Sequence, residues 1–181
     1  SKGLPKNIKI TTPDDLYSLS AHDVFVGRGI DFHRYAFKEN SILKLAGVEI
    51  PFNYQIIAHS DGDIILHALA DAILGAGGYR DIGYYFTDKS PENLNLDSKK
   101  IIDEAICLIS KKQLKLNNVD VTIVAQKPNL SNYMSKMELS LSSILGISLD
   151  RISLKATTTE GMGEIGEENG LAVYALATLK N

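Results

Sequence analysis

The stretch HSDGDIILHALADAILG, residues 59–75, predicts an almost wholly apolar helix. Ser60 and Asp61 are of the types that cap a helix N-terminus, and a glycine such as Gly75 commonly follows the last turn. We therefore expect a helix that begins at this cap and runs to Leu74. A helix that is apolar on nearly all sides is typical of the interior of a domain, so the rest of the fold is expected to pack around it.

Three polar residues interrupt this helix at intervals of four, namely Asp63, His67 and Asp71. Residues four apart lie on the same side of a helix, so the three form one narrow polar stripe. Polar groups in a buried helix are costly unless they are paired or bind a metal. Because carboxylates often orient metal-binding histidines, we interpret His67 as a metal ligand that Asp63 and Asp71 hold in place.

The preceding stretch VFVGRGIDFH, residues 24–33, predicts a strand that ends in two further candidate ligands. Asp31 and His33 are two residues apart, so in a strand they project from the same face. A carboxylate and an imidazole are suitable ligands for a zinc-like ion. Taken alone, this short pattern is more typical of a surface Asp–His pair. Together with His67 it predicts a metal site.

The rest of the chain alternates between short strands and single helices. The spacing of apolar residues predicts a hairpin over 43–50, helices over 97–109 and 131–145, and strands over 119–123, 152–156 and 171–179. This order predicts a single domain, residues 23–181, of the α/β (α+β) class, in which helices cover a sheet.

Composition and charge exclude several classes of protein. The 181 residues are 44% hydrophobic and 23% charged, as in ordinary soluble domains. A net charge of −3 offers no basic surface to nucleic acid or to an anionic membrane. No apolar run approaches the roughly 18 residues that span a bilayer. The single cysteine, Cys107, excludes an internal disulfide framework and a cysteine-based zinc finger.

Residues 1–22 have no hydrophobic periodicity. Their first ten residues include Lys2, Lys6 and Lys9 but no acid, and there is no apolar segment of the kind found in secretory signals. We expect a poorly ordered N-terminal extension, or the remnant of a transit peptide or of cloning.

Two further motifs contain residues that bind phosphates or metals. His59 and Ser60 would lie at a helix N-terminus, where free backbone amides favour an anion. The stretch KATTTEG, residues 155–161, supplies three hydroxyls and the carboxylate of Glu160 at the end of a strand. Helix capping and strand formation explain each motif equally well on its own.

Five motifs, taken in order, resemble those of the 2-C-methyl-D-erythritol 2,4-cyclodiphosphate synthase family. They are GxGxDxH at 27–33, HSDGD at 59–63 followed by His67, DIG at 81–83, VDVT at 119–122 and KATTTE at 155–160. The resemblance implies a phosphorus–oxygen lyase of non-mevalonate isoprenoid biosynthesis. Such an enzyme converts 4-diphosphocytidyl-2-C-methyl-D-erythritol 2-phosphate into 2-C-methyl-D-erythritol 2,4-cyclodiphosphate and CMP.

The resemblance also implies roles for single residues. The metal site that includes His67 would hold one Zn²⁺, and Glu160 would bind a second divalent ion, Mg²⁺ or Mn²⁺. His59 and Thr158 would stabilise the transition state. The cytidine diphosphate substrate would contact Ser60, Asp81, Gly83, Phe86, Asp88, Ala125, Lys127, Pro128, Leu130, Ala156, Thr157 and Thr159.

The family fold implied by the resemblance is a mixed β-sheet with helices on one face. Three chains would pack their sheets around a central axis as a homotrimer, with active sites between subunits. The alternating apolar residues of the final strand, 171–179, favour such a second buried face.

Three positions depart from the family pattern. Thr87 and Asn129 replace a proline and a lysine, and Glu167 replaces an arginine that the family associates with an anion in the trimer cavity. With Glu164 and Glu167 there, we do not expect that anion site. The basic N-terminus and the excess of lysine over arginine favour a plastid (apicoplast-like) location, with the bacterial cytoplasm as the alternative.

Two other functions fit the same residues. A zinc-dependent phosphoesterase could use the metal site around His67 to activate water. A metal-stabilised trimeric ligand-binding module would use it for stability alone.

Overall fold

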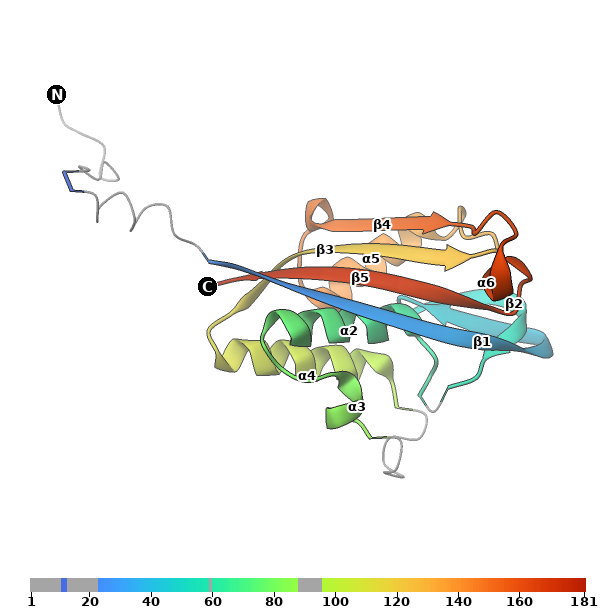
Figure 1. The fold of residues 1–181 in the computed structure, drawn as a ribbon, viewed down its shortest axis with the longest axis horizontal. Helices are drawn as coiled ribbons and strands as arrows, with labels where there is room; N and C mark the ends of the chain where they lie inside the picture. Colours follow the sequence, from blue (N-terminus) through green and yellow to red (C-terminus); the bar gives the residue numbers. More distant parts are fainter. Residues whose placement is uncertain (1–10, 13–22, 59, 88–95) are drawn as a thin grey trace.

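A five-stranded sheet forms one layer of the protein, with the strand order β2-β1-β5-β3-β4 (Figure 1). The structure is a computed structural model that describes residues 11–12, 23–58, 60–87 and 96–181. The strands are β1 Val24–Leu45, β2 Val48–Ile56, β3 Lys115–Ala125, β4 Ile152–Thr157 and β5 Gly170–Lys180. Strands β3 and β4 pair in parallel, whereas β1 with β2, β1 with β5 and β3 with β5 pair antiparallel. The predicted mixed sheet is therefore confirmed.

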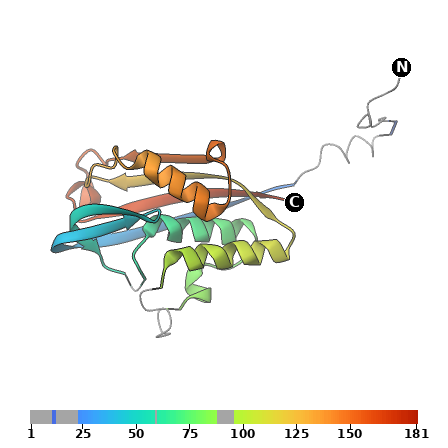
Figure 2. The same cartoon turned by 180° about the vertical axis from the view of Figure 1, so that it is seen from behind.

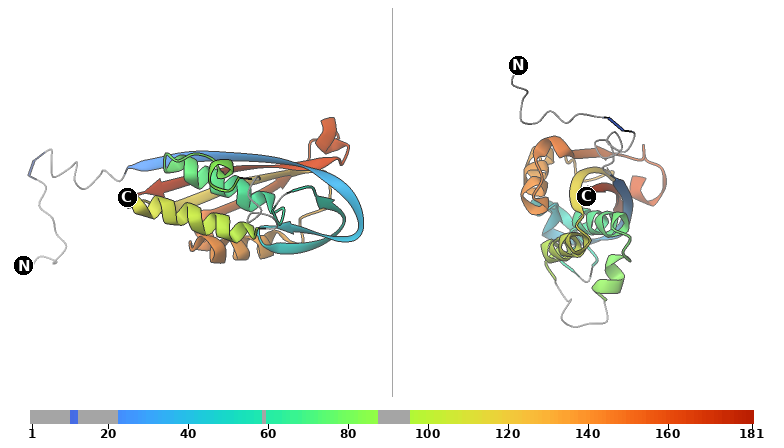
Figure 3. Two further views of the ribbon diagram at one scale, coloured as in Figure 1. Left: turned by 90° about the horizontal axis from the view of Figure 1, so that it is seen from below. Right: turned by 90° about the vertical axis from the view of Figure 1, so that its left-hand side faces the viewer.

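Helices cover one face of this sheet (Figure 2). The helices are α2 Ile64–Ala76, α3 Ile82–Tyr85, α4 Ser98–Lys111, α5 Met134–Leu145 and α6 Gly163–Gly166. The long helices α2 and α4 lie side by side along the sheet (Figure 3). The core forms between them and the sheet, and α2 contributes 11 buried residues, including His67. The apolar stretch at 59–75 thus fills the interior, as its composition predicts.

The opposite face of the sheet carries exposed apolar side chains. In β5, Val173 and Ala175 are buried beneath the helices, while Tyr174 between them is 42% exposed. On the neighbouring β1, Val26 and Phe32 are each 60% exposed. Because side chains alternate between the two faces of a strand, these exposed residues share the face away from the helices.

Several predicted boundaries are wrong by a few residues. Helix α2 begins three residues after Asp61, because Asp63 is the N-cap and its carboxylate accepts from the Leu66 amide. It also continues past Gly75 to Ala76. Strand β1 is longer than expected, since it runs unbroken from Val24 through His33 into the β1–β2 hairpin.

Some of the predicted site residues and the predicted N-terminal extension lie outside the described residues. This applies to His59, to Asp88 and to the predicted N-terminal extension at 1–22, apart from residues 11–12.

Among the described residues, every helix is too short or too polar to span a lipid bilayer.

Candidate active site

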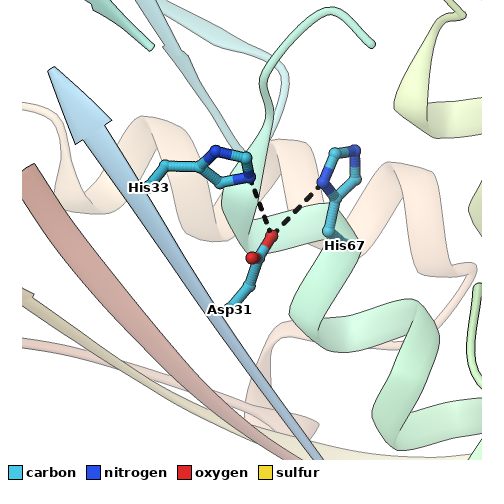
Figure 4. A group of neighbouring side chains, drawn as sticks. All are labelled: Asp31, His33 and His67. Carbon is cyan, nitrogen blue, oxygen red and sulfur yellow. Dashed lines mark ion pairs between the residues drawn. The ribbon is translucent and has the colours of Figure 1, made fainter. Parts of the chain in front are cut away.

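Asp31, His33 and His67 converge where β1 faces helix α2 (Figure 4). The Oδ2 atom of Asp31 lies 3.4 Å from Nε2 of His33 and 3.3 Å from Nδ1 of His67. One ligand atom from each side chain falls within 4.8 Å of the others. Two imidazole nitrogens and a carboxylate oxygen form a donor set that fits a divalent metal ion.

The backbone fixes the orientation of the His33 ring. Its Nδ1 lies 3.0 Å from the carbonyl oxygen of Ile57. Since a carbonyl oxygen only accepts hydrogen bonds, Nδ1 carries the proton and donates it. In the neutral ring, the lone pair of Nε2 therefore faces Asp31, which is the arrangement that a metal-binding histidine requires.

Charge within the cluster favours the ionised carboxylate. Burial raises the pKa of Asp31, but hydrogen bonds and charge from His33 and His67 outweigh it and lower the pKa to about 2. The hydrogen bond to Asp31 raises the pKa of His33 above its usual value, against the effect of burial. A metal ion would take the place of these protons, because both imidazoles must be neutral to coordinate it.

The second nitrogen of His67 faces two hydroxyl groups. Its Nε2 lies 2.9 Å from Oγ of Ser98 and 3.1 Å from Oγ of Ser60. His67 is 7% exposed and Ser98 is fully buried. The ring of His67 is therefore held between the carboxylate of Asp31 and a pair of serines.

The structure corrects the role predicted for Asp63 and Asp71. Within the described part of the chain, neither carboxylate hydrogen-bonds to His67. Asp63 is fully buried and accepts from the amides of Ala46 at 2.8 Å and Gly47 at 2.6 Å, in the β1–β2 turn. Asp71 accepts from the Ile82 amide at 2.8 Å. Both carboxylates instead anchor neighbouring backbone segments.

A cavity of about 410 Å³ opens directly over the metal-ligand cluster. It brings together residues from β1, α2, α3 and the N-terminal region of α4. The predicted site residues in its wall are Asp31, His33, Ser60, His67, Asp71, Asp81, Gly83 and Phe86. Asp81 also caps helix α3, since its carboxylate accepts from the Tyr84 amide at 3.0 Å.

A second cavity, of about 330 Å³, lies at the ends of β3 and β4. It contains most of the residues predicted to contact the cytidine half of the substrate. Its wall includes Ala125, Pro128, Leu130, Ala156, Thr157 and Thr158, and none of these residues lines the first cavity.

Four predicted residues in or near the second cavity bond to nearby groups of the same chain. The Lys127 ammonium lies 2.9 Å from Oε1 of Glu168. Glu160 accepts from the Thr158 hydroxyl at 3.2 Å, and the Thr159 hydroxyl donates to the Met162 carbonyl at 2.7 Å. Glu160 is not part of the cluster that converges on Asp31.

Comparison with known proteins decides the family. The model of the YgbB family matches residues 24–180, which include both cavities. The chain belongs to the YgbB family. The 2-C-methyl-D-erythritol 2,4-cyclodiphosphate synthase of Pseudomonas aeruginosa (strain UCBPP-PA14) is 43% identical over 154 residues, covering 85% of this chain and 97% of that protein. The resemblance of the sequence motifs is thereby confirmed.

One further relative and one solved structure add to this comparison. The bifunctional enzyme IspD/IspF of Campylobacter fetus subsp. fetus is 43% identical over 176 residues, which cover 95% of this chain. The chain spans about half the length of that relative, 47%. A solved structure of IspF from Plasmodium falciparum in complex with CDP has a TM-score of 0.76 and 37% identity, and covers 89% of this chain and 98% of that one.

Three further residues of this chain lie behind the site, although the sequence does not mark them as parts of it. Ser98 contacts His67 and donates to the carboxylate of Asp61, which in turn pairs with the Lys44 ammonium. Burial raises the pKa of Asp61, but Lys44 and Ser98 outweigh it and hold the pKa below its usual value. In the sequence, Asp61 and Ser98 have the appearance of ordinary capping residues, and no motif connects either of them to Lys44.

Proposed function

We propose that the chain converts 4-diphosphocytidyl-2-C-methyl-D-erythritol 2-phosphate into 2-C-methyl-D-erythritol 2,4-cyclodiphosphate and CMP. The observation that carries the proposal is the convergence of Asp31, His33 and His67 within one cavity of a YgbB family fold. The relatives named as cyclodiphosphate synthases, which align over almost their whole length, support it.

The reaction is an intramolecular phosphoryl transfer. An oxygen of the 2-phosphate attacks the β-phosphorus of the diphosphate, and the bond from that phosphorus to the bridging oxygen breaks. CMP leaves with the electron pair of that bond. Such a reaction requires a folded substrate and neutralised phosphate charge more than a protein nucleophile.

The residues of the chain position the substrate and stabilise charge. We assign the methylerythritol side to Ser60, Phe86 and Asp88, together with His59. Asp81 and Gly83 would contact the ribose. His59 and Thr158 would donate hydrogen bonds to the phosphoryl oxygens as charge develops in the transition state. The cytosine would enter the second cavity, whose proposed contacts are Ala125, Lys127, Pro128, Leu130, Ala156 and Thr157. We also propose Thr159 as a substrate contact.

Asp31, His33 and His67 fit a divalent ion, and we propose that this ion is Zn²⁺. When bound, it supplies Lewis-acid polarisation of the reacting phosphates. We propose Glu160 as a ligand of a second ion, Mg²⁺ or Mn²⁺, because hard carboxylate oxygens suit these metals in phosphate sites.

We further propose a homotrimer in which each active site combines residues of two chains. The two cavities have no wall residue in common. We propose that a neighbouring chain brings its cytidine cavity to Asp31, His33 and His67. The exposed apolar residues on the open sheet face, including Phe32 and Tyr174, support burial against other copies.

The match to the bifunctional relative bears on the whole protein. It covers 95% of the chain, against 85% for the Pseudomonas synthase. We propose that the domain is joined to a second enzyme domain, as in that relative. Immunodetection of the native polypeptide would test the joined arrangement, since a product no longer than this chain would contradict it.

The curated relatives compared above are bacterial, so they do not support the plastid prediction. We propose the bacterial cytoplasm as the location instead.

Incubation with the proposed substrate tests the central activity. We expect ³¹P NMR to show the cyclic diphosphate and CMP, each formed in step with loss of substrate. Linear phosphates would indicate the phosphoesterase instead. No turnover, combined with a lower melting temperature for His67→Ala, would indicate a non-catalytic ligand-binding module. The Cys107→Ala variant is a suitable control, because this exposed residue lies outside both cavities.

A further inference from the structure

The hydrogen bonds around His67 indicate which of its two ring nitrogens carries the proton. Its Nδ1 faces Asp31 in the ligand cluster, whereas its Nε2 lies 2.9 Å from the Ser98 hydroxyl. A neutral imidazole has one protonated nitrogen and one lone pair. Coordination of a metal beside Asp31 therefore requires the proton to be on Nε2.

Ser98 decides which tautomer is stable. Its hydroxyl has a single proton, and it donates this proton to Oδ1 of Asp61, which as a carboxylate can only accept. The hydrogen bond between Ser98 and His67 must then take its proton from the imidazole ring, so Nε2 donates to the Ser98 oxygen. The lone pair of Nδ1 is left facing Asp31.

Asp61 is itself held in place from three directions. Its other oxygen, Oδ2, pairs with the Lys44 ammonium, whose Nζ also lies 3.5 Å from Oδ1 of Asp97. The Asp61 amide donates to the carbonyl oxygen of Leu96 at 3.2 Å, which joins the loop before α2 to the start of α4. The ion pair with Lys44 favours the ionised form of Asp61, which is the form that cannot donate a proton to Ser98.

We infer that Ser98 and Asp61, with Lys44 behind them, are positioning residues that fix the metal-binding tautomer of His67. This inference rests on the proposed metal-dependent function. None of the three residues belongs to the ligand cluster, so each acts only through its hydrogen bonds. Groups of this kind that orient metal-bound histidines typically contribute about 10- to 100-fold in affinity.

Zinc affinity of the full chain, measured by competition with a chromophoric chelator, tests the inference. We expect Ser98→Ala and Asp61→Ala each to weaken binding by about 10- to 100-fold. Because the two residues act in series, the double variant should lose little more than either single variant. Ser110→Ala is the matched control, since this serine lies on the same helix and its hydroxyl donates to the Ile106 carbonyl. Wild-type affinity in Ser98→Ala, or losses that add in the double variant, would overturn the inference.

The ring nitrogens of His67 provide a direct readout that needs no variant of uncertain stability. In ¹⁵N-histidine NMR spectra of the zinc-loaded wild-type protein, we expect Nε2 to be protonated and Nδ1 to be metal-bound. A proton on Nδ1 would contradict the inference even if the variants failed to fold. Failure of the proposed function is separate: tight zinc binding with the expected tautomer but no cyclic product would reject the reaction and keep the positioning role. Cyclic product with wild-type zinc affinity in Ser98→Ala would do the reverse.

Discussion

A Cβ atom placed on Gly29 would lie 1.9 Å from the carbonyl oxygen of Ala68, so strand β1 and helix α2 are in direct backbone contact there. The same holds one turn along the helix, where a Cβ atom on Gly27 would lie 2.1 Å from the Ala72 carbonyl oxygen. Only residues without a side chain allow this approach. It brings His67, which precedes Ala68, next to Asp31 on the strand.

Gly29→Ala should therefore damage both the fold and the metal site. The added methyl group meets helix backbone that cannot rotate away, so we expect a loss of about 3 kcal/mol in the free energy of unfolding, at the upper end of overpacking costs. Displacement of α2 should also lower zinc affinity. Urea denaturation and chelator competition would measure the two effects. Gly75→Ala is the matched control, because the atoms nearest to its Cβ lie 3.9–4.0 Å away and alanine favours a helix by up to about 1 kcal/mol. Equal stability of the two variants would contradict the close-contact explanation.

The sequence is sufficient to predict the ligand cluster and the class of fold. Asp31 and His33 project together because strand side chains alternate, and His67 is a polar residue on an apolar helix. Both patterns are local in the sequence, so they can be recognised without knowledge of tertiary contacts. The mixed sheet and helices on one face followed from the family resemblance.

The supports of the cluster could not be predicted in the same way. Helical spacing placed Asp63 and Asp71 beside His67, but tertiary backbone amides from the β1–β2 turn and from α3 compete for their carboxylates. One of the two actual partners of His67, Ser98, is 31 residues away and has the sequence features of a helix start. A serine in the first turn of a helix carries no separate sequence signal for a hydrogen bond to a metal-binding histidine in another helix.

The position of Asp63 predicts a large structural effect of its removal. Its carboxylate caps α2 and satisfies the amides of Ala46 and Gly47 in the β1–β2 turn. Asp63→Ala loses the cap and leaves turn amides without a partner in the interior, so we expect a cost of about 2–4 kcal/mol. Asp97→Ala removes the half-exposed cap of α4 and should cost about 1 kcal/mol. Denaturation midpoints measure both, and a larger loss for the Asp97 variant would show that Asp63 is not the anchor of the hairpin.

The ligand cluster should make the stability of the metal-free protein depend on pH. Because the folded-state pKa of His33 is raised above 6.5, its contribution is fully present below pH 6.5 and is lost as the pH rises through the raised value. The pKa of Asp31 is lowered from 3.8 to about 2, so its contribution is present above pH 3.8 and is lost as the pH falls toward 2. The Asp31–His33 pair therefore stabilises the metal-free protein most between about pH 4 and pH 6.5.

Thermal unfolding at pH 6.5 and pH 8.5 would check this dependence. The melting temperature of the metal-free protein should fall over this interval. Asp63, whose pKa burial raises to about 6, is already largely ionised there and contributes little to the change. With saturating zinc the trend should reverse, since metal binding requires neutral imidazoles. Asp31→Asn should flatten the metal-free profile, and an unchanged slope in that variant would assign the pH dependence to other groups.

The open face of the sheet makes the proposed trimer testable with a single charge. Phe32 is 60% exposed on β1, and its ring packs edge-on against Tyr174 of β5 at a centroid distance of 6.0 Å. If this face is buried against other copies, Phe32→Glu places a carboxylate in an apolar interface, where an unpaired charge is strongly unfavourable. We expect sedimentation equilibrium to give a trimer mass for the wild-type chain and a largely monomeric mass for the variant. Turnover should fall with the loss of trimer, because the cytidine cavity of the neighbour would be missing.

The control for this experiment lies on the other side of the molecule. Leu139 is 59% exposed on helix α5, so Leu139→Glu adds the same charge at an apolar position of similar exposure on the helical layer. This variant should stay trimeric and active. A monomeric wild-type chain with full activity would reject the shared active site. Dissociation caused equally by both substitutions would show that charge in general, and not the open sheet face, controls assembly.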